Sequence, residues 1–164
     1  MSWNLDGIPP LLQPALEARL AVLAGQGGLP AWPEAAAALG SLPLVWTCSD
    51  FVAEACLRDA TLLPWLASGD RLRMALPAAA LERELQAEIA AAGDEARLMD
   101  ALRRFRRRHL ARIAWRDLAG FADVETVLRE LTELADICIR AACRLAAAAL
   151  ALRHGTPRGA DGRQ

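Results

Sequence analysis

Hydrophobic residues return every three or four positions through most of this chain, and that interval places them on one face of an α-helix. Glycine, proline and helix-capping side chains interrupt the pattern. Valine, isoleucine and threonine are too sparse to build a sheet, so the predicted fold class is all-α. The pattern predicts helices over residues 11–24, 33–40, 50–58, 60–67, 77–92, 94–119 and 124–154.

The last predicted helix is the longest, at about 46 Å. Asp123 is placed to cap its first turn, and Gly155 followed by Pro157 ends it. Small or hydrophobic residues recur along this helix in alternating steps of three and four, and we call this row the seam. The helix is therefore expected to pack against other helices along its length. We expect this seam to face the core: Val124, Val127, Leu131, Leu134, Cys138, Ala141, Leu145, Ala148 and Leu152.

The last three predicted helices are joined by short connections, which make neighbouring helices antiparallel. The sequence thus predicts an antiparallel helical bundle with a long C-terminal helix, in which the shorter N-terminal helices cap one end or side. Residues 1–157 are expected to form a single helical domain. Residues 158–164 are polar and glycine-rich, and we expect them to be a disordered tail.

The predicted helix over 94–119 combines an apolar face with seven arginines between residues 103 and 116. Its apolar face consists of Leu98, Leu102, Phe105, His109 and Ile113. Four arginines at successive i,i+4 steps form a basic stripe, which we expect to face away from the core: Arg104, Arg108, Arg112 and Arg116. Asp117 follows directly and could orient an arginine of another helix. His109 is interpreted as a core or boundary residue.

These five residues, Arg104, Arg108, Arg112, Arg116 and Asp117, are the candidate binding site. The guanidinium groups could receive phosphate or a nucleotide, because their planar forks match phosphate oxygens. They could equally bind acidic side chains of a neighbouring domain or protein. A solvated charged face, paired with acids nearby, is the third interpretation. The sequence suggests no catalytic residue and no metal ligand.

Composition narrows the choice of partner and compartment. The net charge is −1, and all nineteen basic residues are arginine, so basicity is local to one patch. The four cysteines form no CxxC pair and are expected to be buried, reduced thiols, which fits the cytoplasm. The first residues lack the pattern of a signal peptide. No apolar run reaches the roughly 20 residues of a membrane span.

Three segments in order also resemble one enzyme family. Residues 103–120, RRFRRRHLARIAWRDLAG, resemble the segment that precedes the first catalytic domain of bifunctional glutamine synthetase adenylyltransferase/adenylyl-removing enzymes. Residues 48–66 are similar to the family's early helical region, and residues 130–142 to its long following helix. The HGTPR motif ending at Arg158 is similar to the family's lead into a catalytic strand. The resemblance covers residues 46–158, whereas residues 1–45 match weakly.

The resemblance implies a role in nitrogen regulation, in an enzyme that attaches AMP from ATP to glutamine synthetase and removes it with phosphate. Such enzymes carry a Gly-Ser-Asp-x-Asp turn that holds Mg²⁺ and nucleotide phosphates. That turn is missing here, since Ser49 and Asp50 lack both the glycine and the second aspartate. The chain is therefore expected to be the N-terminal helical portion, inactive alone and without its own cofactor, while Mg²⁺ and ATP belong to the intact enzyme.

The implied partners are the catalytic domain that follows and, further, glutamine synthetase or a nitrogen-signalling regulator, with no nucleic acid or membrane. Two other functions stay open. The arginine-rich helix could lie along a nucleic-acid backbone, although the neutral net charge and the lack of lysine count against it. The chain could also be a free-standing helical adaptor that associates through its long seam.

Overall fold

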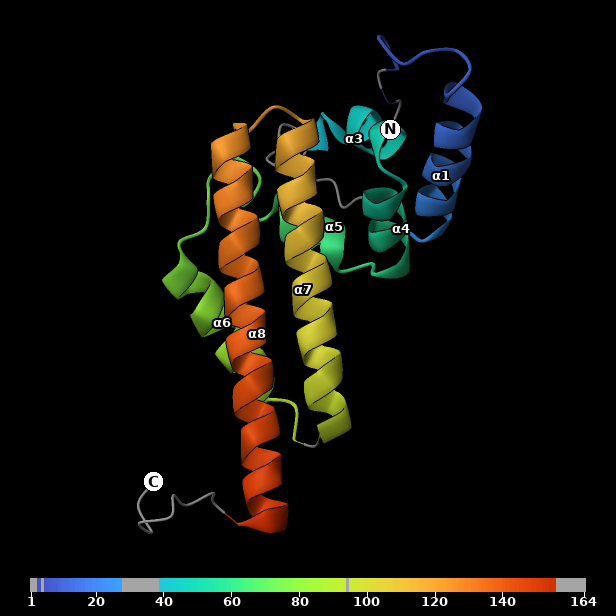
Figure 1. The fold of residues 1–164 in the computed structure, drawn as a ribbon. Coiled ribbons are helices and arrows are strands. Elements are labelled where there is room, and N and C mark those ends of the chain that lie inside the picture. Colours follow the sequence, from blue (N-terminus) through green and yellow to red (C-terminus); the bar gives the residue numbers. More distant parts are fainter. Residues whose placement is uncertain (1–2, 4, 28–38, 94, 156–164) are drawn as a thin grey trace.

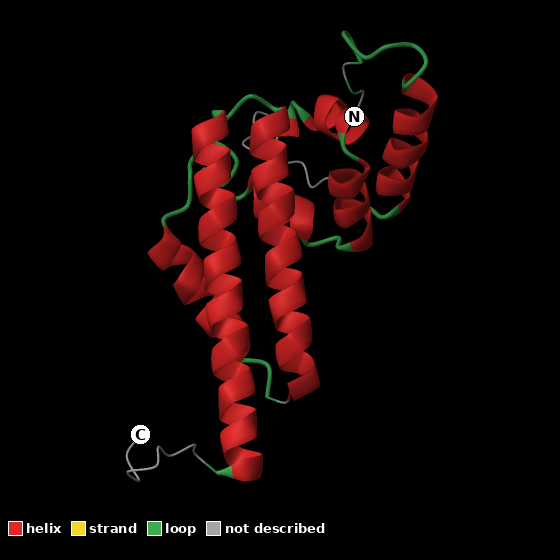
Figure 2. Ribbon diagram, in the orientation of Figure 1, coloured by secondary structure: helices red, strands yellow, loops and turns green. Residues whose placement is uncertain are grey.

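The computed structural model describes residue 3 and residues 5–27, 39–93 and 95–155, and every regular element in these ranges is a helix (Figure 2). The all-α prediction is therefore confirmed. Most of the helix expected over 33–40 and all of the tail expected over 158–164 fall outside the described residues. The helices are α1 (Gln13–Gly25), α3 (Leu42–Cys48), α4 (Asp50–Arg58), α5 (Leu62–Ala67), α6 (Ala78–Ala90), α7 (Glu95–Leu118) and α8 (Val124–His154).

The short N-terminal helices depend on proline and on side-chain caps. The sequence pattern missed α3, which carries Pro43 in its first turn, where the missing N–H of proline costs nothing. Helix α4 begins at Asp50 as predicted, and Ser49 Oγ accepts the Val52 N–H at 3.3 Å. Helix α5 begins at Leu62, two residues later than predicted, because the Asp59 carboxylate accepts the Thr61 N–H at 2.9 Å and holds a turn there.

Helices α7 and α8 are the longest and lie side by side in opposite directions (Figure 1). Gly120, with φ of 69°, ends α7, and the Phe121 N–H returns to the Arg116 carbonyl at 2.7 Å. Asp123 caps α8 as predicted, since its carboxylate accepts the Thr126 N–H at 2.7 Å. For the shorter helices, the antiparallel bundle stays a prediction.

Two hydrophobic clusters form the core, and α7 contributes to both. The first cluster gathers buried residues of α1, α3, α4 and α5 around Ala111 and Trp115 of α7. The second joins α6 and α8 to Leu102, Phe105 and Ile113 of α7. Helix α7 is thus the central element, and its position explains why a helix with so many arginines has buried residues on more than one side.

The predicted core seam of α8 is wrong for several residues. Leu134 and Ala141 are buried, and so is Ile137, which the seam did not include. Leu131 is 36% exposed, Leu152 is 91% exposed and Val124 is exposed as well. The reason is that α8 is apolar over an arc wider than α6 and α7 cover, so the pattern alone could not fix which part of the arc faces inward.

Candidate functional site

The structure separates the predicted arginine stripe into two parts. Arg104 is exposed and Arg108 is half-buried, whereas Arg112 and Arg116 are fully enclosed. The expectation that all four face away from the core is therefore wrong for Arg112 and Arg116. Their part of α7 lies between the two clusters, and both side chains point into the interior of the fold rather than toward solvent.

Glu130 of α8 forms ion pairs with both buried arginines. Arg112 Nη2 donates to Glu130 Oε1, and Arg116 Nε donates to Glu130 Oε2 at 3.0 Å. Burial lowers the pKa of the Arg112 guanidinium, and the Glu130 carboxylate opposes that shift. Two guanidiniums and one carboxylate leave a net positive charge at this place, which is costly unless further hydrogen bonds satisfy it.

Those further bonds come from the segment between α5 and α6. Arg112 Nη1 donates to the carbonyl oxygens of Arg71 and Met74 at 3.1 and 3.3 Å, and Arg116 Nη1 donates to that of Leu72 at 2.9 Å. The two arginines thus fasten this connection to α7 and α8. Apart from Arg112 Nε, which is buried without a hydrogen-bond partner, the donors named here bond within the fold. The cluster therefore holds the structure together rather than presenting a surface for a ligand.

Sequence reasoning did not single out Glu130. A signal was present, because Glu130 lies four residues before Leu134 and seven before Ile137, which puts a charge on the buried face of α8. A charge at such a position needs a buried partner of opposite sign.

The remaining candidate residues have different surroundings. Arg108 lies 3.5 Å from Glu88 of α6, and its guanidinium stands 5.3 Å from the centre of the Trp65 ring. Arg104 and Arg108 together line two hollows of about 420 Å³ each, both of which also contain acidic residues. Asp117 is exposed, and among the described residues no ion pair includes it.

His109 is buried, as predicted, between aromatic rings. Its ring stands edge-on to Trp65, with centroids 5.1 Å apart, and Phe105 lies on another side at 4.4 Å. Glu84 Oε2 is 3.6 Å from Nε2. Desolvation lowers the pKa of the imidazole, with Arg112 and Arg108 adding to the effect and Glu84 opposing it.

Acidification is therefore expected to weaken the fold through His109. An unfolded chain takes up a proton on this residue below about pH 6.5, whereas the native chain resists protonation because its pKa is lower. The contribution of His109 to the free energy of unfolding is therefore fully present above that pH and is lost as the pH drops. We expect a loss of about 1 kcal/mol between pH 7.5 and 5.5 in urea unfolding followed by circular dichroism. His109→Leu should remove this loss, while His154→Leu, at an exposed position, should keep it. Equal pH dependence in both variants would contradict the assignment.

The cysteine prediction is only partly right. All four thiols are free, but only Cys56 is buried, while Cys138 is half-buried and Cys48 and Cys143 are exposed. Burial raises the pKa of the Cys56 thiol to about 12. Ser49 and Asp50 have structural roles, as a cap and as the partner of Arg19 at 2.6 Å.

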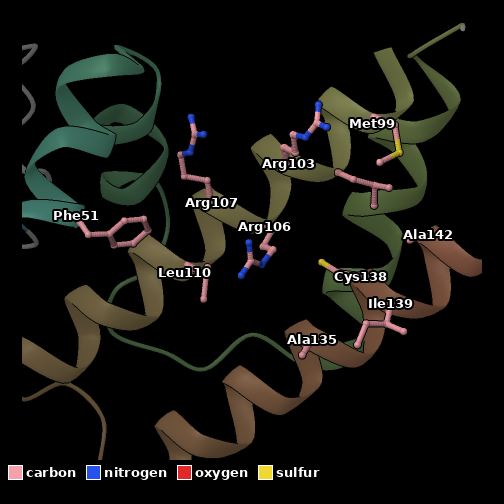
Figure 3. Close-up of a pocket in the computed structure, with 11 residues that line it drawn as sticks. Phe51, Met99, Arg103, Arg106, Arg107, Leu110, Ala135, Cys138, Ile139 and Ala142 are labelled. Carbon is pink, nitrogen blue, oxygen red and sulfur yellow. The ribbon is translucent and has the colours of Figure 1, made fainter. Parts of the chain in front are cut away.

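An exposed groove runs between α7 and α8, and we call it the α7–α8 furrow. It consists of two adjoining hollows of about 570 and 390 Å³ that share Phe51 and Leu110. The larger hollow is shown in Figure 3, where Arg106 reaches from α7 into the space before α8. Its walls are mainly apolar, with a basic edge on the α7 side. The larger hollow is lined by Phe51, Met99, Leu102, Arg103, Arg106, Arg107, Leu110, Ala135, Cys138, Ile139 and Ala142.

A family model described as glutamate-ammonia ligase adenylyltransferase matches residues 39–164, which include α3 to α8 and the whole furrow. The chain belongs to this family. It is 39% identical to the bifunctional glutamine synthetase adenylyltransferase/adenylyl-removing enzyme of Thioalkalivibrio sulfidiphilus over 98% of its own length. It is 38% identical to the enzymes of the same name from Nitrosococcus oceani, over 87% of the chain, and Pseudomonas aeruginosa, over 95%.

This adenylyltransferase-family chain spans only 15 to 17% of those relatives' lengths. The similarity to the Thioalkalivibrio enzyme covers more of the chain than residues 46–158. None of the described helices is both long and apolar enough to cross a membrane. Within the described ranges, no three His, Cys, Asp or Glu side chains come together as metal ligands.

Proposed function

We propose that this chain is the N-terminal helical portion of an enzyme that adenylylates and deadenylylates glutamine synthetase, and that it serves there as a scaffold. The family match supports this assignment, and so does the fact that the chain spans only 16% of the length of the Thioalkalivibrio enzyme. The observation that carries the scaffold role is the α7–α8 furrow, an exposed and largely apolar groove within the matched residues. Apolar surface of this kind marks a site of interaction with another protein segment.

The buried charge cluster gives the scaffold its rigidity. Arg112, Arg116 and Glu130 connect α7 and α8, and their bonds to the Arg71, Leu72 and Met74 carbonyls fix the connection between α5 and α6. A surface on such a frame keeps its shape when a partner binds, which lowers the entropic cost of binding. We assign Mg²⁺, ATP and the chemical steps to the rest of the enzyme.

Among possible partners, we favour the catalytic domain that follows in the intact enzyme, with glutamine synthetase or a nitrogen-signalling regulator as further partners, all in the cytoplasm. A nucleic-acid module has less support than the sequence suggested, because Arg112 and Arg116 are buried and cannot reach a phosphate backbone.

The test uses this chain in place of its counterpart. A hybrid is made in which the chain replaces the matching segment of the Thioalkalivibrio enzyme, and AMP transfer to glutamine synthetase and phosphate-dependent AMP removal are measured. We expect both activities in the hybrid and none in the 164-residue chain alone. The unaltered Thioalkalivibrio enzyme is the positive control. An inactive hybrid would contradict the family role, and release of AMP as ADP by the chain alone would contradict the scaffold role.

A further inference from the structure

Helix α8 has a second apolar stripe in addition to its buried face. Leu128, Leu131, Ala135, Ile139 and Ala142 recur at steps of three and four. At 100° per residue, this stripe lies roughly 130° around the helix from the buried residues near Leu134 and Ile137. Leu128 and Ile139 are 60% and 61% exposed. A contiguous stripe of this kind is unusual on a surface that meets only water.

Helix α7 supplies the opposite wall of the groove with the same spacing. Met99, Arg103, Arg106 and Leu110 follow one another at steps of four, three and four. Two neighbouring helices with such rows leave a channel between them that a third helix can fill. The α8 residues that line the furrow run from Val127 to Ala142, which corresponds to roughly four turns, or about 22 Å, of an incoming helix.

The charges of the furrow determine what kind of helix fits. Arg103, Arg106 and Arg107 line the larger hollow on the α7 side. Asp117 of α7 lines the smaller hollow, so the basic edge belongs to the larger one. The residues of the α8 stripe carry no charge. A helix with an apolar row flanked by acidic residues complements both features. A second copy of this chain is a poorer match, because its own furrow carries the same three arginines.

We infer that the α7–α8 furrow is the docking site for an acidic amphipathic helix from the remaining part of the same adenylyltransferase polypeptide. The inference rests on the proposed function, since about five sixths of the relatives' length lies outside the part that this chain matches. The docked helix adds a third member to the α7–α8 pair and covers Leu128, Leu131 and Ile139. The furrow thereby joins the scaffold to the part of the enzyme that carries the chemistry.

The first experiment places one charge inside the furrow and the same charge outside it. Ile139→Asp and Cys143→Asp are made in the hybrid enzyme and in the isolated chain. Both positions are exposed on α8, but only residue 139 lines the furrow. We expect both isolated variants to melt like the parent chain, and only Ile139→Asp to lower both activities of the hybrid, by roughly tenfold or more.

The second experiment reverses the basic edge. Arg106→Glu with Arg107→Glu should lower the hybrid's activities, because acidic residues of the docked helix would then be repelled. Arg83→Glu, at an exposed position of α6 outside the furrow, is the control and should leave the activities unchanged. Equal effects of the two changes would contradict charge complementarity at this groove.

Native cysteines provide a readout that does not depend on activity. Cys138 lines the furrow and Cys143 does not, and cleavage after Arg140 and Arg144 places them in separate peptides for mass spectrometry. Alkylation of Cys138 should slow by roughly tenfold in the hybrid relative to the isolated chain, while Cys143 should react similarly in both.

The outcomes separate the two proposals. An inactive hybrid made with the unaltered chain refutes the proposed function. An active hybrid in which Cys138 stays reactive and Ile139→Asp has no effect refutes the docking site alone. Sedimentation measures the oligomeric state of the isolated chain. If the parent chain is a dimer and the Ile139→Asp variant is a monomer, the furrow binds a second copy of the chain, and the inference is overturned.

Discussion

Replacing Glu130 with alanine is expected to destabilise the chain by about 3–5 kcal/mol, because two guanidiniums would then remain buried without their carboxylate. Arg112 and Arg116 are almost fully enclosed, so neither can turn toward water without disrupting the packing of α7. A loss of this size is a large fraction of the stability of an ordinary domain. Urea unfolding at pH 7, followed by circular dichroism, measures it.

Two further variants separate charge pairing from simple loss of volume. Glu125→Ala removes an exposed carboxylate from the first turn of the same helix and should cost less than about 1 kcal/mol. Combining Glu130→Leu with Arg112→Met and Arg116→Met removes all three charges, and most of the stability should return. If Glu130→Ala unfolds at the same urea concentration as the parent chain, the cluster does not stabilise the fold in the way described.

Replacing Trp115 with alanine should have a similarly large effect, of about 3–5 kcal/mol. Its indole is fully buried in the first hydrophobic cluster, among α1, α3, α4 and α5, and Nε1 donates to Ser41 Oγ at 2.9 Å. This side chain connects α7 to the short helices, so its loss leaves a cavity at the junction. Thermal unfolding by circular dichroism should show a much lower midpoint.

The contribution of the indole N–H can be measured separately. Ser41→Ala leaves the ring in place and removes only the acceptor, so it should cost about 1–3 kcal/mol. Phe51→Ala, at an exposed position on α4, is the matched control and should change stability little. A Trp115→Ala chain as stable as Phe51→Ala would show that α7 does not hold the N-terminal helices.

Local signals in the sequence were sufficient for the ends of the long helices. Asp123 caps α8 and Gly155 ends it, both as expected, because a cap is formed by residues within one or two turns of it. The apolar face of α7 was also correct for Leu102, Phe105 and Ile113. Helix α3 was missed, since its seven residues around Pro43 are too few to show a clear period.

The candidate site shows where sequence reasoning stops. The four arginines of the stripe share one spacing, yet Arg104 and Arg108 are exposed or half-buried, whereas Arg112 and Arg116 are enclosed. The difference arises because Glu130 of α8 and carbonyl groups of the connection between α5 and α6 bind the enclosed pair. Spacing along a helix states which residues share a face. It does not state which elements cover that face.

The sequence by itself determined that this chain is helical, where its long helices begin and end, and which family its segments resemble, because these depend on local spacing and on motifs. Only the tertiary structure decided that Leu134 faces the core and Leu131 the furrow, and that Arg112 and Arg116 serve the fold. The physical reason is that burial depends on contacts between helices far apart in sequence, and the apolar arc of α8 is wide enough to allow more than one arrangement.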